Sequence, residues 1–145
     1  GQLPHVIFAG FVSRDEVQYV YSKSEVGLLC YDNSPDFKMS FPNKFGEYLA
    51  NGLAVLTTVD GAMQRAYGDG GFIDTVEPTP AAIANAMIAR VRRVPDAKSS
   101  VNARAVFRKD FDSDIVYAAF CDHVERISTG MNETQCSQPG NDNDH

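Results

Sequence analysis

Lys44 and Glu47 are the side chains best suited to binding chemistry in this sequence, and both lie in the stretch FPNKFGEYLANGLAVLTT. The spacing of its apolar residues predicts a short helix over about 42–51. Pro42 suits the first turn because its missing N–H would have no partner there, and Gly52 suits the left-handed position that ends a helix. The start of such a helix attracts anions, for example a diphosphate, through unpaired N–H groups and a partial positive charge. Lys44 would add its own charge there.

The predicted helix has two different faces. An apolar stripe recurs at spacings of three and four and is expected to be buried: Phe41, Phe45, Tyr48 and Leu49. The other face is polar, with residues four apart and Lys44 beside them: Asn43, Glu47 and Asn51. A carboxylate one turn from a phosphate site can accept two hydroxyls of a ribose, as acidic residues do in dinucleotide-binding folds. The alternative is a surface ion pair of Lys44 with Glu47, worth a few tenths of a kcal/mol, and spacing alone favours it.

The elements around this helix alternate between strand and helix. Short apolar runs predict strands at 5–10, 25–31, 53–58 and 71–76, and the run at 25–31 is apolar enough for burial on both faces. Ser13 and Glu16 form a capping box that starts a helix over about 13–23. Residues 32–40 are expected to form a loop, and further helices are expected at about 79–93, 100–109 and 113–128. The alternation predicts an α/β fold, a Rossmann-like parallel sheet with helices on both faces.

The predicted sheet also indicates where a ligand would bind. Ligands of open α/β sheets lie beyond the carboxyl ends of the strands, where the sequence places the loops 10–13, 31–41 and 58–62. The second of these runs into the start of the helix that carries Lys44 and Glu47. Residues 1–128 are expected to form one domain, and 129–145 a disordered polar tail.

Composition excludes some classes of protein. The chain has 145 residues and a net charge of −6, which argues against a nucleic-acid-binding surface. Its three cysteines and three histidines show no metal-ligand spacing, so neither a metal site nor a cofactor is expected. No apolar run is long enough for a membrane span, and reduced cysteines indicate a cytoplasmic protein. Because the chain opens without Met and enters a predicted strand almost at once, we expect it to be part of a longer protein.

The stretch SFPNKFGEYLANGLAVLTT resembles the signature of the C-terminal domain of family 4 glycosyltransferases, retaining enzymes with the two-domain GT-B fold. Glu47 falls on the second of two glutamates separated by seven residues, and Gly52 and Val55 match the positions that follow. The P-N-K-x-x-E-Y form is similar to members that build bacterial surface polysaccharides. The order of strands, loops and helices is similar to that family from His5 to Ile127.

The resemblance implies that residues 1–128 are a nucleotide-sugar-binding domain, truncated at its start, with a donor site for a UDP- or GDP-linked sugar. Glu47 would hold the ribose, and Lys44 would add charge near the diphosphate. Backbone N–H groups around the helix start would bind the diphosphate itself, at Ser40, Phe41 and Asn43. The turn at Gly10, Phe11 and Val12 would frame the base. The acceptor, a saccharide or lipid-linked saccharide, would be held by an N-terminal GT-B domain outside this chain, so the chain alone is expected to be inactive. The parent protein would be cytoplasmic, with peripheral contact to the inner face of the membrane.

This sequence departs from the family pattern at several positions. Met39 stands where the first glutamate of the pair is expected, a residue that touches the donor sugar, and Asp36 and Lys38 are close enough to substitute for it. The first strand and helix of the domain, and the basic residues that follow them, are not found. The sequence assigns no catalytic residue. A non-catalytic Rossmann-like scaffold or regulatory module is therefore the alternative; a sugar-nucleotide epimerase would need catalytic carboxylates and histidines that cannot be placed.

Overall fold

The computed structural model describes residues 5–92 and 97–129. The chain divides between Arg108 and Lys109 into two compact units, which are described separately. Of the tail predicted at 129–145, residues 130–145 lie outside the described residues.

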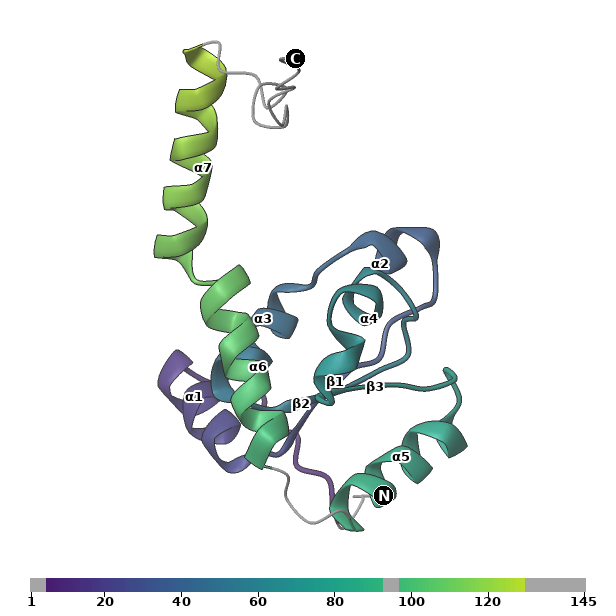
Figure 1. The fold of residues 1–145 in the computed structure, drawn as a ribbon. Helices are drawn as coiled ribbons and strands as arrows, with labels where there is room; N and C mark the ends of the chain where they lie inside the picture. Colours follow the sequence, from purple (N-terminus) through teal and green to yellow (C-terminus); the bar gives the residue numbers. More distant parts are fainter. Residues whose placement is uncertain (1–4, 93–96, 130–145) are drawn as a thin grey trace. The chain divides into compact units, whose positions relative to one another are not determined.

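The first unit is built on a parallel sheet of three described strands, β1 (Val26–Leu29), β2 (Ala54–Thr57) and β3 (Ile73–Thr75), in the order β1-β2-β3. Three helices pack against the strands: α3 (Asn43–Asn51), α4 (Ala62–Tyr67) and α5 (Pro80–Arg92). Figure 1 shows α3 and α4 on one side of the sheet and α5 on the other. The predicted α/β class, with a parallel sheet covered on both faces, is confirmed.

Helix α1 (Arg14–Lys23) starts where its capping box predicted. The Ser13 backbone N–H donates to the Glu16 carboxylate at 2.7 Å, and the Glu16 N–H donates to the Ser13 hydroxyl at 3.3 Å. The hydrogen bond from the Ser13 backbone is the main reason why the pKa of Glu16 is lowered. Both bonds satisfy donors that the first turn leaves open.

The strand predicted at 5–10 is wrong, since these residues form no strand. Ile7 and Phe8 are 92% and 88% exposed, so the segment is neither paired nor packed. A strand is stable only when a neighbouring strand satisfies its backbone groups, and no described strand lies beside this one. For the same reason β1 is an edge strand. Leu28 is 43% exposed, so the expected burial of β1 on both faces is also wrong, whereas β2 is buried throughout.

The loop predicted at 32–40 contains a helix, α2 (Pro35–Met39), and the prediction is wrong there. Pro35 takes the first helical position, which its fixed φ favours. The ring of Phe37 stacks on Tyr31 with centroids 4.8 Å apart, so an aromatic contact stabilises a helix too short to show a clear apolar period.

Helix α3 ends as predicted and begins one residue late. Pro42 is its N-cap rather than its first residue, and Gly52 adopts the left-handed φ of 72°. Phe45 and Leu49 are completely buried beneath it, as the apolar stripe predicted. Phe41 is 43% exposed, so the stripe does not extend to that residue.

The last three helices lie within three residues of their predicted bounds. A short turn of 3₁₀ helix at Gly68–Gly70 follows α4, and α6 (Ala97–Asp110) follows α5. In the second unit, α7 (Ser113–Ser128) has the predicted bounds, with the Asp112 side chain accepting from the Asp114 N–H at its start. None of the helices in the described part of the chain is both long enough and apolar enough to cross a membrane.

Candidate functional site

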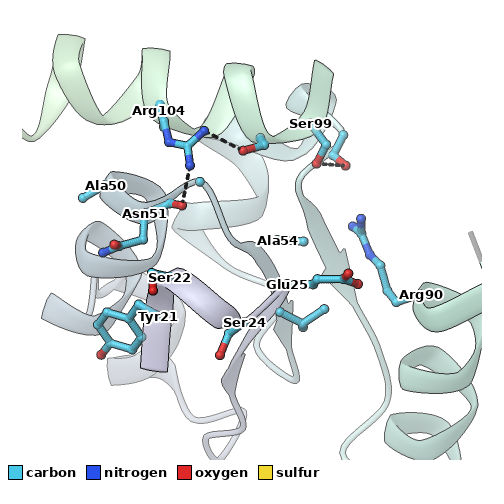
Figure 2. Close-up of a pocket in the computed structure, with 14 residues that line it drawn as sticks. Tyr21, Ser22, Ser24, Glu25, Ala50, Asn51, Ala54, Arg90, Ser99 and Arg104 are labelled. Carbon is cyan, nitrogen blue, oxygen red and sulfur yellow. Dashed lines mark hydrogen bonds between the residues drawn. The ribbon is translucent and has the colours of Figure 1, made fainter. Parts of the chain in front are cut away.

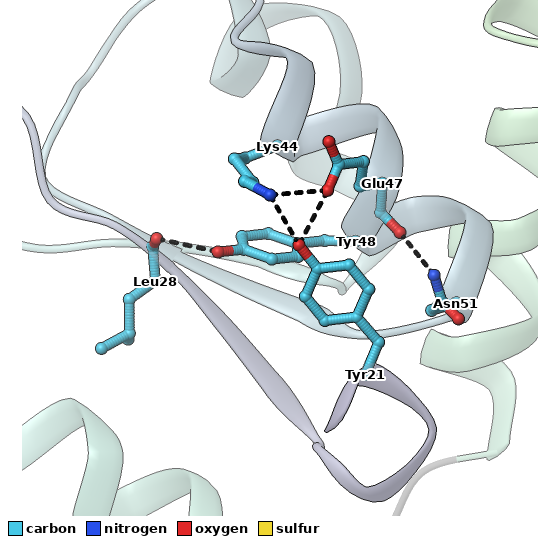
Figure 3. A network of polar contacts seen from close by, with 6 residues as sticks. All are labelled: Tyr21, Leu28, Lys44, Glu47, Tyr48 and Asn51. Carbon is cyan, nitrogen blue, oxygen red and sulfur yellow. Dashed lines mark hydrogen bonds and ion pairs between the residues drawn. The ribbon is translucent and has the colours of Figure 1, made fainter. Parts of the chain in front are cut away.

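Tyr21, Lys44 and Glu47 form a polar network between α1 and α3 (Figure 3). The Tyr21 hydroxyl donates to Glu47 Oε2 at 2.8 Å. Lys44 Nζ donates to the same carboxylate oxygen at 2.8 Å and to the Tyr21 hydroxyl at 3.0 Å. The ion pair that the spacing of Lys44 and Glu47 suggested is therefore present, and a tyrosine from another helix completes it.

Packing between α1 and α3 holds this network in place. Tyr21 is only 8% exposed, and its ring meets the Tyr48 ring edge-on with centroids 5.6 Å apart. The Tyr48 hydroxyl donates to the Leu28 carbonyl of β1 at 3.3 Å, which ties α3 to the edge strand. A buried tyrosine ring usually finds a partner for its hydroxyl, and here that partner is the Glu47 carboxylate.

The network shifts the pKa of each member. The hydrogen bond from Lys44 is the largest cause that lowers the pKa of Glu47, and the bond from Tyr21 adds to it. The hydrogen bond to Glu47 is the largest cause that raises the pKa of Lys44. Burial raises the pKa of Tyr21, so its hydroxyl stays protonated and can donate. At neutral pH the site therefore holds an ionised carboxylate, a charged ammonium and a neutral phenol.

The start of α3 offers fewer backbone donors than the sequence predicted. The Ser40 N–H donates to the Phe37 carbonyl at 3.2 Å and is therefore occupied. Pro42 at the N-cap has no side chain that could accept a hydrogen bond, so the N–H groups of Asn43 and Lys44 lack a side-chain cap. These two N–H groups, one turn from Glu47, are the donors that an anion would meet.

The residues proposed to contact the donor sugar lie on α2, which packs against α4. Met39 is 71% exposed, and its sulfur accepts a hydrogen bond from Arg65 Nη2 of α4 at 3.9 Å. Asp36 lies in the first turn of α2. The backbone of Lys38 packs closely against Gly61, so that a Cβ on residue 61 would collide with the Lys38 backbone.

The turn proposed to frame a base stands apart from the network. Gly10 has the left-handed φ of 69°, Phe11 is fully exposed and Val12 is 41% exposed. Among the described residues, no hydrogen bond or ring contact joins this turn to Lys44 or Glu47. The structure thus brings Lys44, Glu47 and Asn43 together and does not bring the turn at 10–12 to them.

A family model described as Glycosyl transferases group 1 matches residues 1–92. This chain belongs to the group 1 glycosyl transferases. No curated protein and no solved structure matches it. The matched residues include the sheet, α1–α5 and the whole Tyr21–Lys44–Glu47 network of this group 1 glycosyl transferase, so the family match covers the candidate site.

Sequence reasoning missed two side chains of this group 1 glycosyl transferase. The helical spacing of Val17, Val20 and Tyr21 predicts that Tyr21 lies on the apolar face of α1. Its one indication of a polar role is that a tyrosine hydroxyl needs a partner when its ring is buried. Arg65 carries no local indication at all, because it reaches Met39 only after α2 and α4 pack together.

Proposed function

We propose that this group 1 glycosyl transferase binds a UDP- or GDP-linked sugar donor at the start of α3, with Glu47 accepting the ribose hydroxyls. The proposal rests on the arrangement of the two Glu47 carboxylate oxygens. Its Oε2 is held by Lys44 and Tyr21, while the other oxygen points away from both partners (Figure 3). The side chain of Glu47 is 39% exposed, so a ligand can reach it.

The same helix start would bind the diphosphate. The N–H groups of Asn43 and Lys44 lie at the positive end of α3, where anions are stabilised. A lysine ammonium has three N–H donors, and Lys44 uses two of them within the network. The third is left for a phosphate oxygen. During transfer, negative charge develops on the leaving diphosphate, and donors fixed in advance would stabilise it.

The remaining parts of the proposal rest on the family 4 resemblance. They are a retaining transfer of a hexose to a saccharide or lipid-linked acceptor, within polysaccharide synthesis at the inner face of the membrane. The acceptor would be held by a second GT-B domain, and α2, with Asp36, Lys38 and Met39, would face the donor sugar. Because Met39 has no charge, a carboxylate contact from α2 to the donor sugar would come from Asp36.

A binding titration with the 145-residue chain tests the donor site. UDP, GDP, UDP-glucose and GDP-mannose are titrated by calorimetry and by backbone amide NMR into the natural chain and into Glu47→Gln. We expect one nucleotide series to shift the amides of Asn43 and Lys44. Glu47→Gln should weaken that binding by roughly tenfold or more, since charge-assisted hydrogen bonds are about twice as strong as neutral ones.

The matched control is Glu77→Gln, which removes an exposed carboxylate that lies outside the network. Equal affinity in the Glu47→Gln and natural chains would reject the role of Glu47. If none of the four compounds shifts any amide at the start of α3, the alternative of a non-catalytic Rossmann-like module is favoured instead.

A further inference from the structure

A pocket of 790 Å³ lies at the amino ends of the three strands, at the opposite end of the sheet from the start of α3. Figure 2 shows residues that line it. Glu25 precedes β1, Ala54 opens β2 and Gly71 precedes β3, and all three line the pocket. The ends of α1 and α3 form its sides. Its volume falls within the range of about 300–1,000 Å³ that is typical of small-molecule sites.

Helix α6 closes one side of the pocket and is anchored there by side-chain hydrogen bonds. Ser99 Oγ donates to the Gly71 carbonyl at 3.2 Å, and Arg104 Nη2 donates to the Asn51 carbonyl at 2.9 Å. Gly52 makes this approach possible, because a Cβ on it would lie 2.5 Å from Ser100 Oγ. These specific contacts fix the position of α6 at the side of the pocket.

Arg90 supplies the observation that points to a ligand. Its Nε is bonded to the Asp74 carboxylate, and its side chain is only 13% exposed. Its Nη2 is buried and has no hydrogen-bond partner within the described part of the chain. A buried donor without an acceptor is costly and rare in native proteins. Arg90 also lines this pocket, so a small rotation of its guanidinium would let a ligand oxygen accept from Nη2.

The charges around the pocket decide which kind of oxygen fits. Arg90 is paired with Asp74, and the lining also contains the oppositely charged side chains of Glu25 and Arg104. The carboxyl ends of α1 and α3 add partial negative charge. A phosphate or carboxylate in the pocket would be repelled by the Glu25 carboxylate and by these helix ends. A neutral ligand that both donates and accepts hydrogen bonds would find guanidinium donors, a carboxylate acceptor and serine hydroxyls.

We propose that this pocket binds a neutral saccharide, independently of the donor site at the start of α3. Its hydroxyls would donate to the Glu25 carboxylate and accept from the guanidinium groups of Arg90 and Arg104, with Ser22 and Ser24 at its margin. The site involves no bond-making and lies at the far end of the sheet, so it is a binding site for a glycan rather than a second reaction centre.

Backbone amide NMR of the complete chain tests the proposal. The probes are the methyl glycosides of glucose, galactose and mannose, N-acetylglucosamine, and inorganic phosphate. At least one saccharide should shift the amides of Glu25, Gly52 and Ser100 and leave that of Lys44 unchanged. Glu25→Gln and Arg104→Lys should each weaken this binding by roughly tenfold, since each replaces one charged hydrogen-bonding group.

Arg108→Lys makes the same exchange on α6 outside the pocket lining and should leave binding unchanged. The amide spectrum of each variant shows whether α6 keeps its fold, and Glu25→Gln leaves the α6 anchors intact. The proposal is overturned if no saccharide shifts the pocket amides, or if phosphate shifts them and binds more tightly to Glu25→Gln. Nucleotide binding is followed by the amide signals of Asn43 and Lys44. A negative result for saccharides at this pocket therefore does not affect the proposal for the donor site.

Discussion

Replacing Tyr21 by phenylalanine removes one hydroxyl from the contact between α1 and α3 and leaves the ring packing on Tyr48. The hydroxyl donates to Glu47 and accepts from Lys44, so the variant loses two hydrogen bonds to charged groups. The Lys44–Glu47 ion pair at 2.8 Å remains. The variant therefore measures how much stability the Tyr21 hydroxyl adds to that of the Lys44–Glu47 ion pair.

The expected loss of stability is about 1 kcal/mol at neutral pH. Hydrogen bonds to charged groups contribute about 1.5–3 kcal/mol. The side chains of Lys44 and Glu47 are 49% and 39% exposed, so solvent screening reduces the value to the lower end or below. A loss of about 1 kcal/mol lowers the Tm of a domain of this size by roughly 3–5 °C.

The loss should also depend on pH. The pKa of Glu47 is lowered from its ordinary 4.5, so its stabilisation is present above pH 4.5 and is lost as the pH falls through the folded-state value. The pKa of Lys44 is raised from its ordinary 10.5, so its contribution is complete below that pH and is lost as the pH rises through the folded-state value. The difference between the natural chain and the variant should be largest between these two values and should shrink in acid.

Urea unfolding followed by circular dichroism, at neutral pH and in acid, measures this difference. Tyr19→Phe is the control, because Tyr19 lies on the same helix, is 66% exposed and has no hydrogen bond from its hydroxyl to any described residue. If Tyr21→Phe is as stable as Tyr19→Phe at neutral pH, or if its loss persists unchanged in acid, the network does not act as described.

Two further predictions concern the packing that positions the sites. Gly52→Ala should destabilise the chain more than Gly71→Ala, although both glycines have positive φ. At Gly52 the new Cβ would collide with α6, whereas at Gly71 it would meet no atom within 4 Å. Equal urea midpoints for the two variants would contradict the contact with α6. Phe45→Ala should lower the free energy of unfolding by about 3–5 kcal/mol because Phe45 is completely buried. Phe11→Ala is the control and should leave the urea midpoint unchanged because Phe11 is fully exposed. A small loss of stability in Phe45→Ala would show that the core relaxes around the cavity.

Local features were predictable where the chemistry is itself local. The capping box at Ser13 and Glu16, the end of α3 at Gly52 and the burial of Phe45 and Leu49 each depend on residues within a few positions of one another. The order of strands and helices follows from the same short-range periodicity. Helix α2 escaped prediction because a helix of five residues has too few turns to show a period, and its aromatic contact with Tyr31 depends on the fold of the loop.

The sequence by itself determined the α/β class, the helix that carries Lys44 and Glu47, and the pairing of those two side chains, because all three follow from spacing along the chain. Only the tertiary structure decided that Tyr21 joins them and that residues 5–10 form no strand. It also decided that Arg90 Nη2 is buried with no hydrogen-bond partner among the described residues. Each of these depends on segments far apart in sequence. Strand pairing, burial and side-chain hydrogen bonds form between such segments, and the local sequence pattern does not show which distant segment will pack beside a given residue.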